Sequence, residues 1–202
     1  LVKAFHLRLD PKTYDLPAFE KEKLEFLKMV HEIDTGNLSH DTRRKNILLT
    51  CFSVVENTLK SNYYRMNKSA LAFRLDPKLM ATLFYEYKEK FPEIPYGIFF
   101  IKGKSFIAFQ VRFKDVSRGG LRTIFPKKPE HANWERINIF SECYNLAYTQ
   151  QKKNKDIPEG GSKAVIFIEP FEDLSFETEV YQKELHLSGA SSEEIKDKIS
   201  QY

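Results

Sequence analysis

Two short segments combine paired glycines with basic residues in a sequence that is otherwise rich in apolar runs. The first is DVSRGGLR, residues 115–122, and the second is KKNKDIPEGGSKAV, residues 152–165. Paired glycines let a backbone approach a ligand closely, and Arg and Lys bind carboxylates or phosphates. The two segments therefore predict a binding site for a dianion. The alternative is that the glycines form turns and the cations are solvated.

Lys163 stands directly before the apolar run AVIFI, residues 164–168, so it would project from the beginning of a buried strand. An ammonium group at such a place can polarise a carbonyl or an imine. Neither segment matches a P-loop or G-x-G-x-x-G, so nucleotide binding by those routes is not supported. The two cysteines, Cys51 and Cys143, are far apart and lie in no Cys/His cluster, so we expect no metal site. The candidate binding residues are Arg118, Gly119, Gly120, Arg122, Lys153, Gly160, Gly161 and Lys163.

The composition is that of a globular protein, with 202 residues of which 42% are apolar and 30% charged. The net charge of +4 is too small to indicate nucleic acid or an anionic membrane. No apolar stretch reaches the ~18 residues of a membrane span. The low cysteine content favours a reducing, cytoplasmic compartment. Because the chain opens at Leu1 without a methionine before Met29, we expect an excised fragment.

Apolar periodicity predicts a single α/β/α domain with a mixed sheet and a helical N-terminal segment. We divide it into the helical segment 1–66 and an α/β domain, 67–202. Strands are predicted over 2–9, 70–75, 96–101, 106–113 and 164–168. Helices are predicted over 16–33, 41–65, 77–91 and 133–153, with one or two short ones in 175–200. The helix between 113 and 164, with a strand on either side, predicts a βαβ crossover.

Two helices have a predicted buried face. The face of the second helix is Ile47, Leu48, Cys51, Val54, Val55 and Leu59, with Ser39 as the N-cap. The face of the helix at 133–153 is Trp134, Ile137, Phe140, Tyr144 and Tyr148.

Three stretches carry a resemblance to a known family. They are KSALAFRLDP (68–77), EIPYGIFFIKGKSFIAFQVRFKDVSRGGLR (93–122) and YTQQKKNKDIPEGGSKAV (148–165). In order and separation they resemble the N-terminal, substrate-binding domain of the amino-acid dehydrogenases, and most of all the large NAD-specific glutamate dehydrogenases. The resemblance covers about residues 68–170.

The resemblance implies oxidative deamination of glutamate to 2-oxoglutarate and ammonia with NAD, in a cleft between this domain and a Rossmann domain. It implies that Arg118, where smaller relatives carry lysine, meets a substrate carboxylate. It implies that Lys153 binds a substrate carboxylate and that Lys163 is the catalytic lysine. Ala164 and Val165 depart from the family, because they replace a glycine-rich continuation.

Other family features are missing from this sequence. The chain has no dinucleotide fingerprint, and neither Asp173 nor Asp197 sits in the family's proton-transfer motif. We therefore expect NAD to be bound mainly by a domain outside this chain, and the chain alone to be inactive. The resemblance also implies a homo-oligomer, in which the hairpin at 96–113 could meet a neighbour.

Two alternatives remain open. A carboxylate-binding or regulatory module that has lost catalysis would keep Arg118 and Lys153 without a Rossmann domain. A nucleic-acid-binding domain would use the cations of 102–104, 127–128 and 152–155. Acidic residues are interleaved with these cations, which argues against nucleic acid as a partner.

Overall fold

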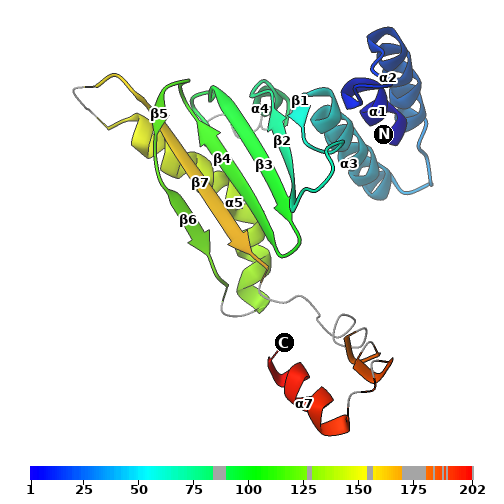
Figure 1. Ribbon diagram of the computed structural model, residues 1–202. Helices are drawn as coiled ribbons and strands as arrows, with labels where there is room; N and C mark the ends of the chain where they lie inside the picture. The colour runs from blue at the N-terminus through cyan, green and yellow to red at the C-terminus, as the bar shows by residue number, and fades with distance from the viewer. Residues whose placement is uncertain are drawn as a thin grey trace.

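The computed structural model describes residues 1–83, 90–126, 129–153, 157–169, 181–183, 185–187, 189 and 191–201. Three helices come first and a mixed β-sheet follows them, so the chain has the predicted α/β class (Figure 1). The three helices are α1 (Val2–Leu9), α2 (Leu16–His31) and α3 (Leu38–Glu56).

Helix α1 occupies the residues for which the sequence predicts a strand, and that prediction is wrong. Ala4 is fully buried in a cluster with Phe19 and Phe52. Tyr64 Oη lies 2.7 Å from His6 Nδ1 in a hydrogen bond. Contacts with distant parts of the chain therefore stabilise this short helix, and the local pattern does not contain them.

The helix predicted from residue 16 is confirmed as α2. The Asp15 carboxylate accepts a hydrogen bond from the Ala18 N–H at 2.9 Å and caps the first turn. The buried side chains share one face of the helix: Phe19, Phe26 and Val30.

Helix α3 differs from its prediction at both ends. Its N-cap is Asn37, whose side-chain oxygen accepts from the His40 N–H at 3.1 Å, so the prediction of Ser39 is wrong. It ends at Glu56 rather than at residue 65, because strand β1 (Thr58–Ser61) follows at once.

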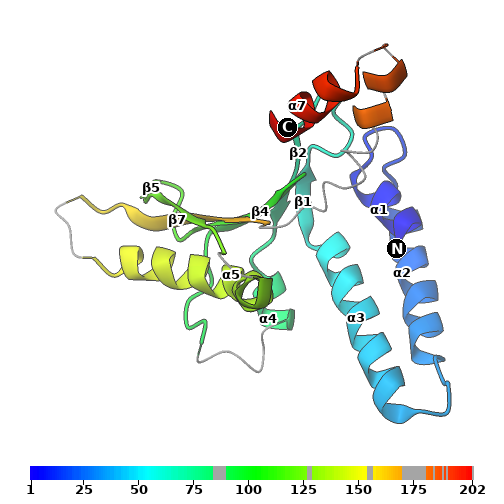
Figure 2. The same cartoon turned by 90° about the horizontal axis from the view of Figure 1, so that it is seen from below.

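The predicted buried face of α3 is only partly correct, because its buried apolar side chain is Phe52. Exposed members of the predicted face are Ile47, Cys51 and Leu59. Half-buried members at the edges of the two apolar cores are Leu48, Val54 and Val55. Figure 2 shows the reason: α2 and α3 run side by side away from the sheet, so much of the α3 surface has no element against it.

Within the described residues, the sheet has seven strands in the order β1-β2-β3-β4-β7-β5, with β6 also paired to β7. The remaining strands are β2 (Ala70–Leu75), β3 (Gly97–Gly103), β4 (Phe106–Arg112), β5 (Ser117–Arg118), β6 (Leu121–Ile124) and β7 (Gly160–Ile168). The antiparallel pairing of β3 with β4 confirms the predicted hairpin. Helix α4 (Leu79–Leu83) begins the helix predicted over 77–91, of which residues 84–89 lie outside the described part.

Helix α5 (Pro129–Gln151) connects β6 to β7, which are parallel and form a βαβ crossover. The prediction is wrong about the first strand of this crossover, because the predicted strand 106–113 is β4, which pairs antiparallel with β7. The helix lies behind the strands in Figure 1 and covers one face of the sheet. Its buried side chains on this side include Ile139, Cys143 and Ala147. The predicted face is wrong at Trp134 and Ile137, which are 69% and 80% exposed. The buried residues Ile139, Cys143 and Ala147 recur every four positions, and this spacing places them on another side of the helix from Trp134 and Ile137. The other predicted members contact the core: Phe140, Tyr144 and Tyr148.

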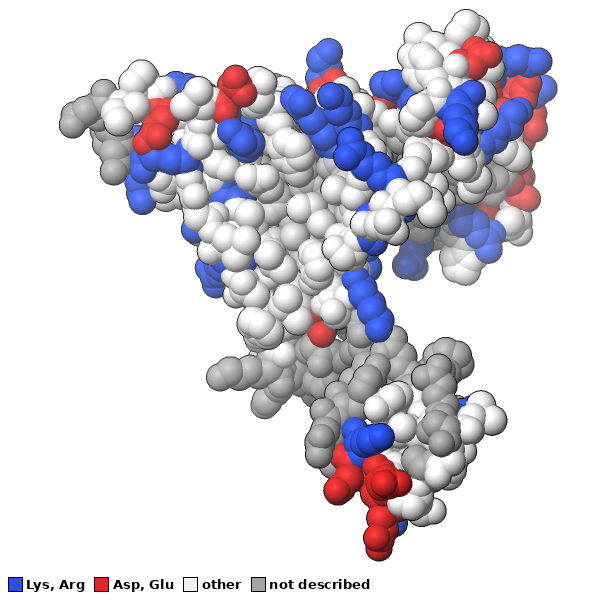
Figure 3. Space-filling model, viewed as in Figure 1, with Lys and Arg blue, Asp and Glu red and all other residues white. Residues whose placement is uncertain are grey.

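The other face of the sheet is turned toward the viewer in Figure 3. Its middle is uncharged, and charged side chains of both signs lie around its edges. By the strand register, this face carries Phe99, Ile101 and Ile166, all half-buried. Near the C-terminus, α7 (Ser192–Gln201) agrees with the predicted short polar helix. No helix in the described part of the chain has the length and apolar character needed to cross a membrane.

Candidate functional site at the start of β7

The two glycine-containing segments meet at one edge of the sheet. Ser117 pairs with Gly160 in parallel β5 and β7, and Leu121 pairs with Ala164 in parallel β6 and β7. Both pairs have an offset of 43 positions (160 minus 117, and 164 minus 121), so Gly119 and Gly120 lie beside Ser162 and Lys163. Strand β7 begins at Gly160, four residues before the predicted start at residue 164.

Close packing explains three of the four glycines. A Cβ on Gly119 would lie 1.5 Å from the Ser162 carbonyl oxygen, and one on Gly161 would lie 2.1 Å from the Gln151 backbone nitrogen. A Cβ on Gly160 would lie 2.5 Å from Cβ of Lys114. None of these positions has a positive φ. The absence of side chains lets β5, β7 and the end of α5 approach one another.

Gly120 is different, because a Cβ there would meet only Lys163 Nζ, at 3.5 Å. The missing side chain thus leaves space directly beside the ammonium group. Lys163 is half-buried and makes no ion pair with any described residue. A cation beside an open position is the arrangement that an incoming anion requires.

The two predicted arginines are both paired with carboxylates. Arg118 forms an ion pair with Glu159, and their side chains are 26% and 21% exposed. Arg122 Nε lies 2.9 Å from Glu142 Oε1. Among the described residues, Lys163 is therefore an unpaired cation next to an arginine whose charge is already balanced.

Lys153 lies just beyond the C-terminus of α5 and is exposed. Its backbone N–H donates to the Gln150 carbonyl at 3.4 Å, and its side chain makes no ion pair within the described ranges. Its neighbour Lys152 lies 3.1 Å from Glu93, and this hydrogen bond raises the pKa of Lys152. The structure does not bring Lys153 into contact with Lys163 among the residues that it describes, and residues 154–156 lie outside them.

Lys163 and Arg118 lie on the same face of the sheet. Lys163 is paired with the buried Val111 in β4, on the side that α5 covers. Arg118 is paired with Gly161, two positions before Lys163, and strand alternation places them on one face. Beneath them, the Cys143 thiol lies 3.3 Å from the Lys163 carbonyl oxygen, and burial raises the pKa of this thiol to about 12. The strand that bears Lys163 is thus fixed to α5.

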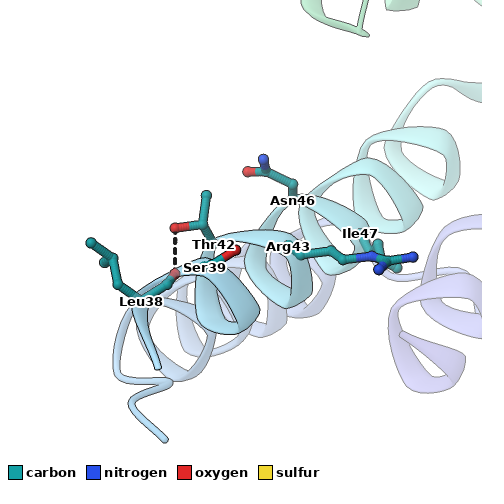
Figure 4. A pocket seen from close by; sticks show the side chains of 6 residues that line it. All are labelled: Leu38, Ser39, Thr42, Arg43, Asn46 and Ile47. Carbon is teal, nitrogen blue, oxygen red and sulfur yellow. Dashed lines mark hydrogen bonds between the residues drawn. The ribbon is translucent and has the colours of Figure 1, made fainter. Parts of the chain in front are cut away.

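Figure 4 shows a groove that has no part in this arrangement. It lies on α3 and is lined by Leu38, Ser39, Thr42, Arg43, Asn46 and Ile47. Thr42 Oγ1 donates to the Leu38 carbonyl at 2.8 Å, and Leu38 is 85% exposed. All the lining residues come from one helix, so the groove is a depression on an exposed surface. No group of three or more His, Cys, Asp or Glu side chains suited to a metal occurs in the described part of the chain.

Comparisons with known proteins agree with the three stretches of resemblance. The chain is 45% identical over 152 residues to the NAD-specific glutamate dehydrogenase of Saccharomyces cerevisiae, covering 74% of this chain and 14% of that protein. The chain is homologous to a segment of the NAD-specific glutamate dehydrogenases. Neurospora crassa has a protein of the same name that is 41% identical over 127 residues, or 62% of this chain and 12% of that protein. Glutamate dehydrogenase 2 of Dictyostelium discoideum is 42% identical over 122 residues, or 60% and 11%. No family model matches the chain.

Relative to these dehydrogenases the chain is short, since it spans about one seventh of the yeast protein.

Two residues of the candidate site were not predicted from the sequence. Glu159 is an acidic residue among basic ones, and this contrast is a signal in the sequence. Only the register of β5 with β7 identifies Arg118 as its partner. Gln151 accepts from the Gly161 N–H at 2.7 Å and holds β7 to α5, and nothing local marks it.

Proposed function

We propose that this segment binds the substrate of an NAD-dependent glutamate dehydrogenase, which deaminates glutamate oxidatively to 2-oxoglutarate and ammonia. The observation that supports the proposal most is the open space at Gly120 beside the unpaired ammonium of Lys163. The homology to NAD-specific glutamate dehydrogenases, at 41–45% identity, supports glutamate as the substrate in this proposal.

In this proposal Lys163 acts electrostatically near the reacting carbon. Its positive charge disfavours protonation of the substrate amine and stabilises the oxygen charge that develops when water adds to the imine. A carbonyl or imine carbon must come close to the ammonium, and Gly120 leaves the position for it. Arg118 and Lys153 are the proposed partners of the substrate carboxylates.

The described residues do not fit NAD itself. The connection from β6 to α5 is FPKK, residues 125–128, which has no glycine to admit a pyrophosphate. The glycine pairs open no helix, because 119–120 lie between strands and 160–161 begin one. We therefore assign no step with NAD to these residues, and propose that another part of the protein binds it. We also propose a reducing cytoplasmic setting and a homo-oligomer, as the resemblance implies.

The test is Lys163→Ala in the full-length protein, with Lys60→Ala as the control, because Lys60 is an exposed lysine on the distant strand β1. Loss of one preorganised charged group lowers kcat by roughly 100- to 1,000-fold. Lys153→Ala is expected to raise KM for glutamate, because a carboxylate partner is lost in the ground state as well. Near-normal kcat in Lys163→Ala would show that the assignment is wrong. Binding of glutamate without any turnover in the wild-type protein would favour the non-catalytic module.

A further inference from the structure

The ion pair between Glu159 and Arg118 places a carboxylate of the protein on the very cation that is proposed to meet a carboxylate of the substrate. We propose that Glu159 is a built-in competitor for Arg118, and that it sets the affinity of the site for dicarboxylates. This inference rests on the proposed function, because it requires Arg118 to bind substrate.

The chemistry of the pair supports competition. Glu159 contacts Nε of Arg118, and a guanidinium carries five N–H donors in one plane. An incoming carboxylate can therefore reach other N–H donors of the same guanidinium. The positive charge of this guanidinium is already balanced by Glu159. Lys163 is proposed to meet the reacting carbon, so it does not replace Arg118 as a partner of the substrate carboxylate. Binding at Arg118 has to share or displace Glu159.

This ion pair is one of several contacts that join the two segments. Backbone hydrogen bonds already join the two segments, since the Gly160 N–H donates to the Val116 carbonyl at 2.8 Å and the Phe113 N–H donates to the Gly161 carbonyl at 2.9 Å. Partly exposed ion pairs contribute little to stability. A variant without the Glu159 carboxylate is thus expected to fold, with Arg118 charged and free.

The experiment compares Glu159→Gln with wild type in the full-length protein. The readouts are KM for glutamate, kcat, and the inhibition constant of glutarate, a dicarboxylate that lacks the reacting group. Removal of a competing, partly screened carboxylate should lower KM and the glutarate constant about three- to tenfold. The value of kcat should stay the same, because Lys163 is untouched. Unchanged or raised constants would overturn the inference, a rise meaning that Glu159 orients Arg118 for binding.

Glu169→Gln is the matched control. Glu169 pairs with Arg136 just past the other end of β7, and its side chain is 19% exposed, close to the 21% of Glu159. This variant should change neither constant, and a fall equal to that in Glu159→Gln would overturn the inference. If Glu159→Gln melts at a much lower temperature, Glu159→Asp replaces it. The aspartate is one methylene shorter, so its weaker contact should give a smaller fall in KM.

Arg118→Met separates this inference from the proposed function. If Arg118→Met leaves KM for glutamate unchanged, the proposed role of Arg118 fails and the competition fails with it. If Arg118→Met raises KM but Glu159→Gln does not lower it, only the competition fails. Adding Glu159→Gln to Arg118→Met should have no further effect, because the competed group is gone.

Discussion

The two ends of strand β7 use similar residues for different purposes. At its start, Gly160 and Gly161 leave no side chains to fill space, and Lys163 lies beside the open position at Gly120. Toward its end, Phe167 is fully buried against the core, with the Arg136 guanidinium 5.3 Å from the centre of its ring. An Arg–Glu ion pair lies near each end. At the proposed site the missing side chain of Gly120 leaves space near the charged pair, whereas the pair at the far end lies beside a filled core.

The far end should respond to substitution through stability alone. Phe167→Ala removes a large buried side chain and is expected to lower the free energy of unfolding by about 3–5 kcal/mol. Under conditions where the variant is folded, KM for glutamate should be within the error of wild type. Urea denaturation together with initial-rate kinetics measures both. A large change in KM at full folding would remove the contrast between the two ends.

At the start of β7, the close packing of Gly119 can be tested in the same way. Gly119→Ala would place Cβ 1.5 Å from the carbonyl oxygen of Ser162, which belongs to the backbone of β7 and cannot move aside alone. We expect a loss of about 3 kcal/mol, the upper part of the range for overpacking. Hydrogen exchange should show weaker protection of β6 than of β3. Stability equal to wild type would mean that Gly119 has no packing role.

Gly120→Ala is the matched substitution one residue later. Its Cβ would be in ordinary contact with Lys163 Nζ, so the unfolding free energy should change by less than about 1 kcal/mol. Turnover should nevertheless fall about tenfold, because the methyl group takes the space beside the ammonium. A thermal melt and a rate assay on the same variant give both numbers. A destabilised but fully active variant would reverse the roles of the two glycines.

The smallest expected effect on stability comes from Cys143, which lies under the start of β7. Its thiol stays protonated at neutral pH. Its folded pKa is raised by burial to about 12 from the ordinary value of 9.0, so the thiol stabilises the fold below pH 9 and this contribution is lost as the pH rises from 9 toward 12. Cys143→Ser should flatten this part of the stability curve. At pH 8 a thiol reagent should modify the exposed Cys51 and leave Cys143 intact until the protein unfolds.

Local patterns in the sequence were sufficient to predict the elements whose determining residues lie close together in the chain. The hairpin of β3 and β4, the strand β2 and the helix α2 follow from turn residues, alternation and apolar periodicity, all within a few positions of one another. Helix α1 was predicted wrongly as a strand because its partners, such as Tyr64, are far along the chain. The exposed face of α3 depends on the absence of neighbours, which no window of sequence reveals.

The candidate site divides in the same way. Its residue types and spacing identified Arg118, Lys163 and both glycine pairs as unusual. Which glycine is needed for packing and which leaves space depends on a register that joins residues 43 positions apart. The pairing of Arg118 with Glu159 follows from the same register. Sequence could therefore name the components but not which cation is free.

The parallel pairing of β5 and β6 with β7 also determines when the site can form. The hairpin of β3 and β4 closes a turn of a few residues, whereas β6 has no partner in β7 until 43 further residues have been made. At ~5–20 residues per second of synthesis, this is a delay of about 2–9 seconds. Closing the longer loop also costs more chain entropy and slows folding. Arg118 therefore has no Glu159 to pair with until that time, and the proposed site can form only when α5 has brought β7 back to the sheet.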